Sequence, residues 1–329
     1  MDYNDTGFIR NKLKLNDSRA KSKDLKPMPE LAIRCGKGGG LPFEHLMTDC
    51  YSGCLCYDNI CYGNCTAALF WLDQGYDFGK RVINKWDEEL FEKDLKSVAS
   101  EQKWFRQGWV SDCSFSQDGW VLVSKISDVL ARYNRHLLII TKGHSLPTDE
   151  ILRNLAKNKV EIRVSLSALD SIDEISRRFK LLELYRQAGG ISIPYVMSCR
   201  YRNQELRDNQ DYIVKYIIDN DYIAGEHPLR VSRNNILISE LEDNGFYHPK
   251  YTDQYWFGRI LDVYPNFVLP APTHLASCYK MEYRTFSQIK NKKYIKGATK
   301  NLPTYEDLLH NRIKNRKELE RHAAYSDQR

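Results

Sequence analysis

The chain has 329 residues, of which 42% are hydrophobic and 28% are charged, and its formal net charge is +6. This composition is that of a globular protein and excludes disordered and collagen-like chains. No apolar run approaches the roughly 20 residues that cross a bilayer, and the N-terminus carries no apolar segment of signal-peptide type. We therefore expect a cytoplasmic protein that does not act in a membrane.

The first elements in chain order are a polar segment and a Gly-rich stretch. Lys, Asn and Asp are frequent near the start, which predicts that residues 1–30 form a polar N-terminal arm. Four of the five residues 36–40 are glycine. Because the sequence shows no strand and helix around them, they are predicted to form a turn rather than a phosphate-binding loop.

Five of the nine cysteines fall within 16 residues, at Cys50, Cys54, Cys56, Cys61 and Cys65. The odd number and the lack of a secretion signal argue against a disulfide framework. Clustered thiolates are soft ligands that bind zinc, Cu(I) or iron–sulfur clusters. Structural zinc sites usually contain Cys-x2-4-Cys pairs with a second pair further along. Here the intervals are three, one, four and three residues, so the spacing favours an iron–sulfur cluster over zinc.

Alternating strands and helices follow the cysteine loop. This alternation predicts a parallel sheet, and a full or partial (β/α) barrel over residues 31–240 is the expected α/β fold. A doubly wound open sheet is the alternative. Residues 241–329 are predicted to form a helical extension that binds substrate. The expected strands cover 103–110, 136–140, 160–166, 191–197 and a region from 223, and the expected helices cover 121–133, 148–158, 171–188 and 207–218.

Polar residues and one cysteine stand just past the ends of these predicted strands. Because active sites of (β/α) barrels lie at the carboxyl ends of the strands, this edge is the expected site. The residues are Asp112, Thr141, Lys142, Ser165, Ser167, Cys199, Arg200 and Arg230.

Two sets of motifs resemble the radical S-adenosylmethionine (SAM) superfamily. The segment Cys50–Tyr57 resembles its Cys-x3-Cys-x2-Cys signature with one residue missing before the last cysteine. The pair Thr141–Lys142 and the segment Val164–Ser167 resemble strand ends of its spore photoproduct lyase-like branch. The resemblance implies a radical SAM barrel, a [4Fe-4S] cluster and SAM as cofactors. Cys50, Cys54 and Cys56 are the first choice of ligands, and sets that use Cys61 or Cys65 stay open.

The resemblance also implies roles for residues at the strand ends. Lys142 would pair with the methionine carboxylate of SAM, because its ammonium group is a compact cation with three donors. Ser165 and Ser167 would hydrogen-bond the ribose or the carboxylate. The superfamily holds the methionine amine of SAM just after the first strand of the series. Ser111, Asp112 and Ser114 would occupy that place.

Two further cysteines are candidate hydrogen-atom donors to a substrate radical. Cys113 stands where the photoproduct lyases carry a donor, and Cys278 lies late in the chain, as the donor of peptide epimerases does. A radical SAM enzyme that modifies a ribosomal peptide, for example by Cα epimerisation, is therefore the expected function. A precursor peptide and a reductant such as flavodoxin or ferredoxin are the expected partners.

Two alternatives to peptide modification stay open. A nucleic-acid enzyme close to the photoproduct lyases would use the basic excess and stack bases on late aromatic residues. A non-catalytic zinc-binding protein would leave the polar strand ends unexplained. The late aromatic residues, which are able to line a peptide groove equally well, are Tyr247, Tyr251, Tyr255, Trp256 and Tyr264.

Overall fold

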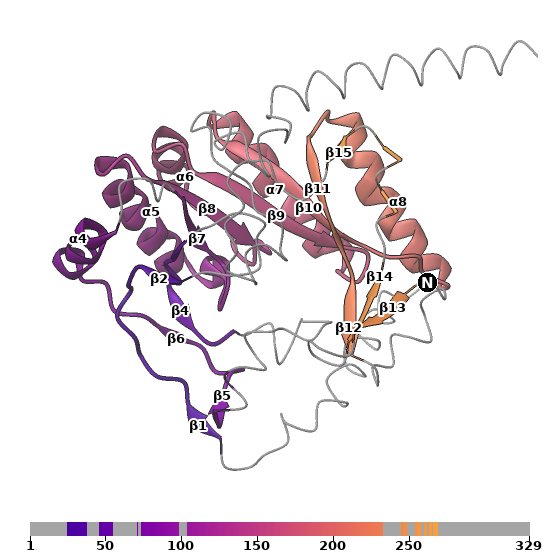
Figure 1. Ribbon diagram of the computed structural model, residues 1–329. Coiled ribbons are helices and arrows are strands. Elements are labelled where there is room, and N and C mark those ends of the chain that lie inside the picture. The colour runs from indigo at the N-terminus through magenta and orange to yellow at the C-terminus, as the bar shows by residue number, and fades with distance from the viewer. Residues whose placement is uncertain are drawn as a thin grey trace, which may run out of the picture.

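The structure is a computed structural model (Figure 1), and its description covers only part of the chain. Three of the five clustered cysteines, Cys56, Cys61 and Cys65, lie outside the described residues, as do Cys278 and most of the predicted arm and extension. The described residues are 25–37, 46–54, 71, 74–98, 104–232, 245–248, 254–257, 260–261, 263–264 and 266–268.

The centre of the fold is an eight-stranded sheet with the order β15-β11-β10-β9-β8-β7-β3-β2. Every neighbouring pair from β15 to β3 is parallel, which confirms the predicted α/β fold. Its central strands are β7 (Trp104–Gln107), β8 (His136–Thr141), β9 (Glu161–Ser167), β10 (Ile191–Ser198) and β11 (Ala224–Pro228).

Three short strands complete this sheet at its edges. β15 (Phe267–Val268) pairs in parallel with β11, and β3 (Leu46–Met47) pairs in parallel with β7. β2 (Gly36–Lys37) pairs with β3 in the antiparallel direction, so part of the predicted Gly-rich turn is a strand. Among the described strands β15 and β2 do not pair with each other, and the sheet is the partial form of the predicted barrel.

Four helices connect the parallel strands where the sequence predicts them. Side chains at the N-caps fix the starts of two of them: Thr148 accepts a hydrogen bond from Ile151 N, and Ser171 forms a capping box with Glu174. None of the described helices is both long and apolar enough to span a bilayer. The four are α5 (Gln117–Arg132), α6 (Asp149–Lys157), α7 (Ile172–Gln187) and α8 (Gln204–Asp219).

The main hydrophobic core lies between the sheet and these helices. Along β9 the residues Ile162, Val164 and Leu166 are completely buried and belong to the core that α5, α6 and α7 cover (Figure 1). Because side chains alternate across a strand, Glu161 and Arg163 face the other side of the sheet. They form a buried ion pair of 2.8 Å there.

Short elements before β7 surround the cysteine loop. β4 (Tyr51–Ser52) pairs with β6 (Val82–Ile83), and β1 (Lys26–Pro27) pairs with β5 (Tyr76–Asp77). The helix α4 (Glu88–Ser97) follows and is not among the predicted elements. Two of its residues are buried, Phe91 and Leu95, and both are apolar.

A three-stranded antiparallel sheet follows β11, with the order β12-β14-β13. The sequence does not predict it within the expected extension. Its strands are β12 (Arg230–Ser232), β13 (Gly245–His248) and β14 (Gln254–Phe257).

Candidate functional site

The cysteine loop leaves the carboxyl end of β3 and turns sharply. Cys50 is completely buried, whereas Cys54 is partly exposed. Between them Gly53 adopts a positive φ of 79°, which favours glycine. Cys54 N donates to Phe78 O at 2.8 Å. The backbone therefore holds these two predicted ligands in a fixed turn.

Asp49, directly before Cys50, ties the loop to the residues after β7. Its Oδ1 accepts hydrogen bonds from Gly108 N and Trp109 N, both at 3.0 Å. Its Oδ2 accepts from Val110 N at 3.2 Å. Burial raises the pKa of Asp49, and these three donors oppose that shift because they stabilise the charged form. Asp49 is not among the residues predicted from the sequence, although its position directly before Cys50 indicates a place in the site.

Asn84 and Gln107 hold the same segment from two other sides. Asn84 Nδ2 donates to Asp49 O at 3.0 Å, and Asn84 N donates to Cys50 O at 2.8 Å. Asn84 Oδ1 also accepts from Ser52 Oγ at 2.8 Å. Gln107 Oε1 accepts from Cys50 N at 3.1 Å. The backbone polar groups around Cys50 are thereby satisfied before any ligand binds, which fixes the position of this thiol.

Gly108→Ala should destabilise the protein and loosen the cysteine loop. Gly108 has a φ of 97°, and an added Cβ would lie 2.1 Å from Ile140 O. We expect a loss of about 3 kcal/mol, since both backbone strain and overpacking contribute. Gly75→Ala is the matched control, because Gly75 has a φ of 80° with nothing near its Cβ position. Equal losses for the two variants in urea denaturation would contradict the close contact with Ile140.

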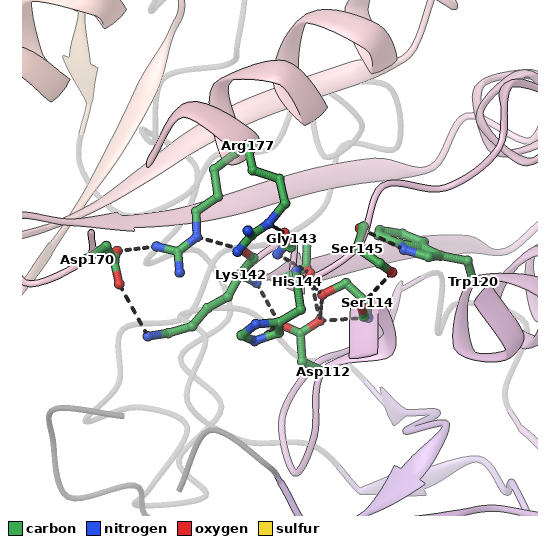
Figure 2. Close-up of polar contacts among 11 residues, drawn as sticks. Asp112, Ser114, Trp120, Lys142, Gly143, His144, Ser145, Asp170 and Arg177 are labelled. Carbon is green, nitrogen blue, oxygen red and sulfur yellow. Dashed lines mark hydrogen bonds and ion pairs between the residues drawn. The ribbon is translucent and has the colours of Figure 1, made fainter. Parts of the chain in front are cut away.

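Asp112 is the centre of a buried hydrogen-bond network at the carboxyl ends of β7 and β8 (Figure 2). Its Oδ1 accepts from Ser114 N at 2.9 Å, Ser114 Oγ at 2.8 Å and Thr141 Oγ1 at 2.6 Å. Its Oδ2 accepts from Lys142 N at 2.6 Å and lies 3.8 Å from His144 Nε2. The carboxylate therefore joins the loop after β7 to the end of β8.

Ser114 extends this network toward α5. Its Oγ accepts from His144 N at 2.8 Å, and its backbone oxygen accepts from Ser145 N at 2.9 Å and Ser145 Oγ at 2.7 Å. Trp120 Nε1 donates to Ser145 O at 3.1 Å (Figure 2). The residues after β8 are thus fixed to the first turns of α5, and Ser114 has a positioning role in addition to any contact with a ligand.

The Lys142 side chain extends toward Asp170, which lies after β9 (Figure 2). Lys142 Nζ is 3.8 Å from Asp170 Oδ1, and the Lys142 side chain is 15% exposed. Arg178 of α7 forms an ion pair with Asp170, and both side chains are completely buried. Arg178 Nε also donates to Lys142 O at 2.5 Å. The lysine is therefore held by a buried charge cluster, and its Nζ atom is itself buried.

The structure places the other predicted cofactor residues on neighbouring elements. Ser111 directly precedes Asp112 and is buried. Ser165 and Ser167 lie on β9, the strand beside β8. Ser167 is completely buried, and its Oγ accepts from Leu169 N at 3.2 Å. The fold thus brings all six predicted cofactor residues to the carboxyl half of three adjacent strands.

Cys113, a predicted hydrogen donor, lies in the short helix η2 (Cys113–Phe115). It is completely buried in the main core, where Trp120 and Tyr51 also lie. Burial raises the pKa of its thiol well above the usual range, and the charges of Asp112 and Cys50 act in the same direction. Cys113 is therefore a protonated thiol close to the cysteine loop.

The hydrogen bonding of several buried polar atoms near the cysteine loop indicates whether a cofactor fits there. Gln107 Nε2, Ser111 Oγ and Arg81 Nη1 have no hydrogen-bond partner among the described residues. Native proteins satisfy nearly all such groups, so a cluster of unsatisfied donors indicates a bound group with acceptors. Burial raises the pKa of the Cys50 thiol well above its usual range. Because thiolate ligands form when a metal binds, these residues fit an iron–sulfur cluster with an anionic ligand beside it.

No protein-family model matches the chain, and no curated protein matches it in sequence. Its structure is similar to that of spore photoproduct lyase, with a TM-score of 0.48 and 14% identity over 73% of this chain and 80% of that one. A second mutant form of that enzyme gives 0.46 and 14%, over 68% and 76%.

A second similar protein is the radical S-adenosylmethionine methyltransferase TsrM from Kitasatospora setae, solved with cobalamin and a [4Fe-4S] cluster bound. It aligns at 9% identity with a TM-score of 0.44, over 84% of this chain and 61% of its own.

Proposed function

We propose that the protein is a radical SAM enzyme that binds a [4Fe-4S] cluster at the cysteine loop and SAM at the Asp112 network. The observation that carries the proposal is the connection between these two sites. Asp49 holds the residues from Gly108 to Val110 against Cys50, and Asp112, two residues after Val110, holds Lys142. This connection supports a common site for Cys50 and the predicted SAM residues Asp112 and Lys142.

Each group at this edge has a defined task in the proposal. Cys50 and Cys54, with one of the three cysteines beyond the described loop, hold the cluster. Lys142, whose buried Nζ lies 3.8 Å from Asp170 Oδ1, pairs with the methionine carboxylate. Ser111, whose buried Oγ lacks a partner among the described residues, donates to SAM. Bound together, the cluster and SAM supply a 5′-deoxyadenosyl radical, and the protein shields that radical from solvent.

The reaction that we propose is the modification of a ribosomal peptide, with Cα epimerisation as the specific form. The cofactors would supply a radical that takes a Cα hydrogen, and a thiol would return a hydrogen atom to the opposite face. The thiyl radical left behind would regain one electron from the expected reductant and one proton from water. Cys278 is the proposed donor. Cys113 is the alternative, because its raised pKa keeps it a thiol and it lies beside the cysteine loop. Because Cys113 is completely buried, a substrate reaches it only if the surrounding core rearranges.

Turnover in D2O tests this reaction. With a candidate precursor peptide, an epimerase that uses an exchangeable thiol adds one deuterium at a single Cα, which mass spectrometry detects. Cys278→Ala should abolish deuterium incorporation while SAM cleavage continues, and Cys113→Ala should leave both unchanged. Deuterium-free product would exclude a thiol donor. Modification of a thymine-containing oligonucleotide instead of a peptide would assign the nucleic-acid alternative.

A further inference from the structure

We propose that Gln107 donates a hydrogen bond from its side-chain amide to a sulfur atom of the cluster and thereby raises the reduction potential of that cluster. The inference rests on the proposed function, because it concerns the same cluster site. Gln107 is the last residue of β7 and is completely buried. It is a positioning residue, because it acts through the cluster and touches no substrate.

The hydrogen bond to Cys50 fixes the orientation of the Gln107 amide. Gln107 Oε1 accepts from Cys50 N at 3.1 Å. A backbone N–H can only donate, so the atom that faces it must be the carbonyl oxygen of the amide rather than its nitrogen. The Nε2 atom, which carries the N–H donors, is therefore bonded to the same carbon as the oxygen that Cys50 N contacts.

These donors lack an acceptor within the described protein. Gln107 Nε2 is buried and has no hydrogen-bond partner among the described residues. A buried amide donor without a partner costs about 1–3 kcal/mol, and native proteins retain such groups mainly where water, an ion or a ligand completes them. Cys50, which is equally buried, supplies a sulfur acceptor beside the amide once its thiol becomes a thiolate ligand. A cluster sulfide provides a second acceptor of the same kind.

The electrostatic effect of this contact has a definite sign. Reduction adds negative charge to the cluster, so a donor to its sulfur stabilises the reduced form and raises the potential. Two charged groups stand near the same loop. The Asp49 carboxylate, held by three backbone donors, lowers the potential. The Arg81 guanidinium, 5.4 Å from the Tyr51 ring centroid, raises it. Gln107 differs from both because its amide lies directly against the cysteine.

Redox titration of reconstituted protein, monitored by EPR, tests the inference. Gln107→Leu should reduce the ratio of reduced to oxidised cluster about tenfold at a fixed solution potential, which corresponds to about 59 mV for a one-electron couple. Gln210→Leu is a matched control. Gln210 is also buried, although it lies in α8, and its Oε1 accepts from Cys199 N at 3.1 Å just after β10. This control should leave the potential unchanged.

A second variant and a second measurement distinguish the loss of the hydrogen bond from misfolding of the cysteine loop. Gln107→Glu keeps an oxygen acceptor for Cys50 N but lacks the amide donor, so it should lower the potential at least as much. In the wild-type protein, glutamine labelled with 15N in its side chain should show a pulsed-EPR coupling to the reduced cluster, and Gln107→Glu should lose it. If the cluster assembles but its potential and its 15N coupling do not depend on Gln107, the inference is wrong and the proposed function is unaffected. A wild-type protein that assembles no cluster overturns the proposed function as well.

Discussion

Replacing Arg178 with Met should lower the free energy of unfolding by about 3–5 kcal/mol, because it leaves a buried carboxylate without its main partner. Arg178 and Asp170 form an ion pair in which both side chains are completely buried. Arg178 also donates to the backbone oxygen of Lys142. After the substitution, Asp170 loses this contact, and the ammonium group of Lys142 lies further away, at 3.8 Å. We expect this to be the largest effect of any single change on stability.

Urea denaturation measures this effect, and an exposed ion pair provides the control. Arg132 contacts Glu88 and Glu92 on the surface, where its side chain is 50% exposed. Arg132→Met should therefore cost less than about 1 kcal/mol. Combining Arg178→Met with Asp170→Asn should cost less than the sum of the two single changes, since neither charge is then left alone. Additive losses would show that the pair is not coupled as its geometry indicates.

Asp112→Asn should weaken SAM binding tenfold or more while the protein stays folded. The carboxylate accepts from Lys142 N at one oxygen and from three other donors at the second oxygen. An asparagine can satisfy the three donors with its oxygen, but its NH2 group then faces Lys142 N. Loss of a hydrogen bond to a charged group costs about 1.5–3 kcal/mol. Lys142 should therefore move away from the position that pairs with the methionine carboxylate.

Calorimetric titration of SAM into the reconstituted protein measures the change. Asp118→Asn is the control, because Asp118 is an exposed residue in the first turn of α5. We expect wild-type affinity for the control and an intact cluster absorption spectrum in both variants. If Asp112→Asn bound SAM with unchanged affinity, the Asp112 network would not be part of the cofactor site.

The sequence predicts the strands and helices of the core well, because their signals are local. The helices α6 and α7 lie within the predicted ranges 148–158 and 171–188, and the apolar run from His136 marks β8. By contrast, α4 and the small sheets around the cysteine loop are missed. β4, for example, has two residues, and its pairing with β6 depends on contacts distant in the sequence. Such pairings leave little local pattern.

The sequence predicts those residues of the candidate site that directly follow a strand, and it does not predict the others. Asp112 and Lys142 are found because they stand at strand ends. Asp49 and Gln107 are missed because their roles come from contacts with residues 59 and 57 positions away. The structure also changes the expectation for Asp112. Its carboxylate accepts four hydrogen bonds from its own chain, so we propose that it positions Lys142 in addition to its predicted place at the methionine amine.

Anaerobic reconstitution with iron and sulfide, followed by reduction in the presence of SAM, tests the central claim most directly. We predict a brown protein with bound iron and sulfide that cleaves SAM to 5′-deoxyadenosine. Cys50→Ala and Cys54→Ala should each abolish both properties. A colourless protein that binds zinc and leaves SAM intact would contradict the account and assign the cysteine loop to a structural metal site.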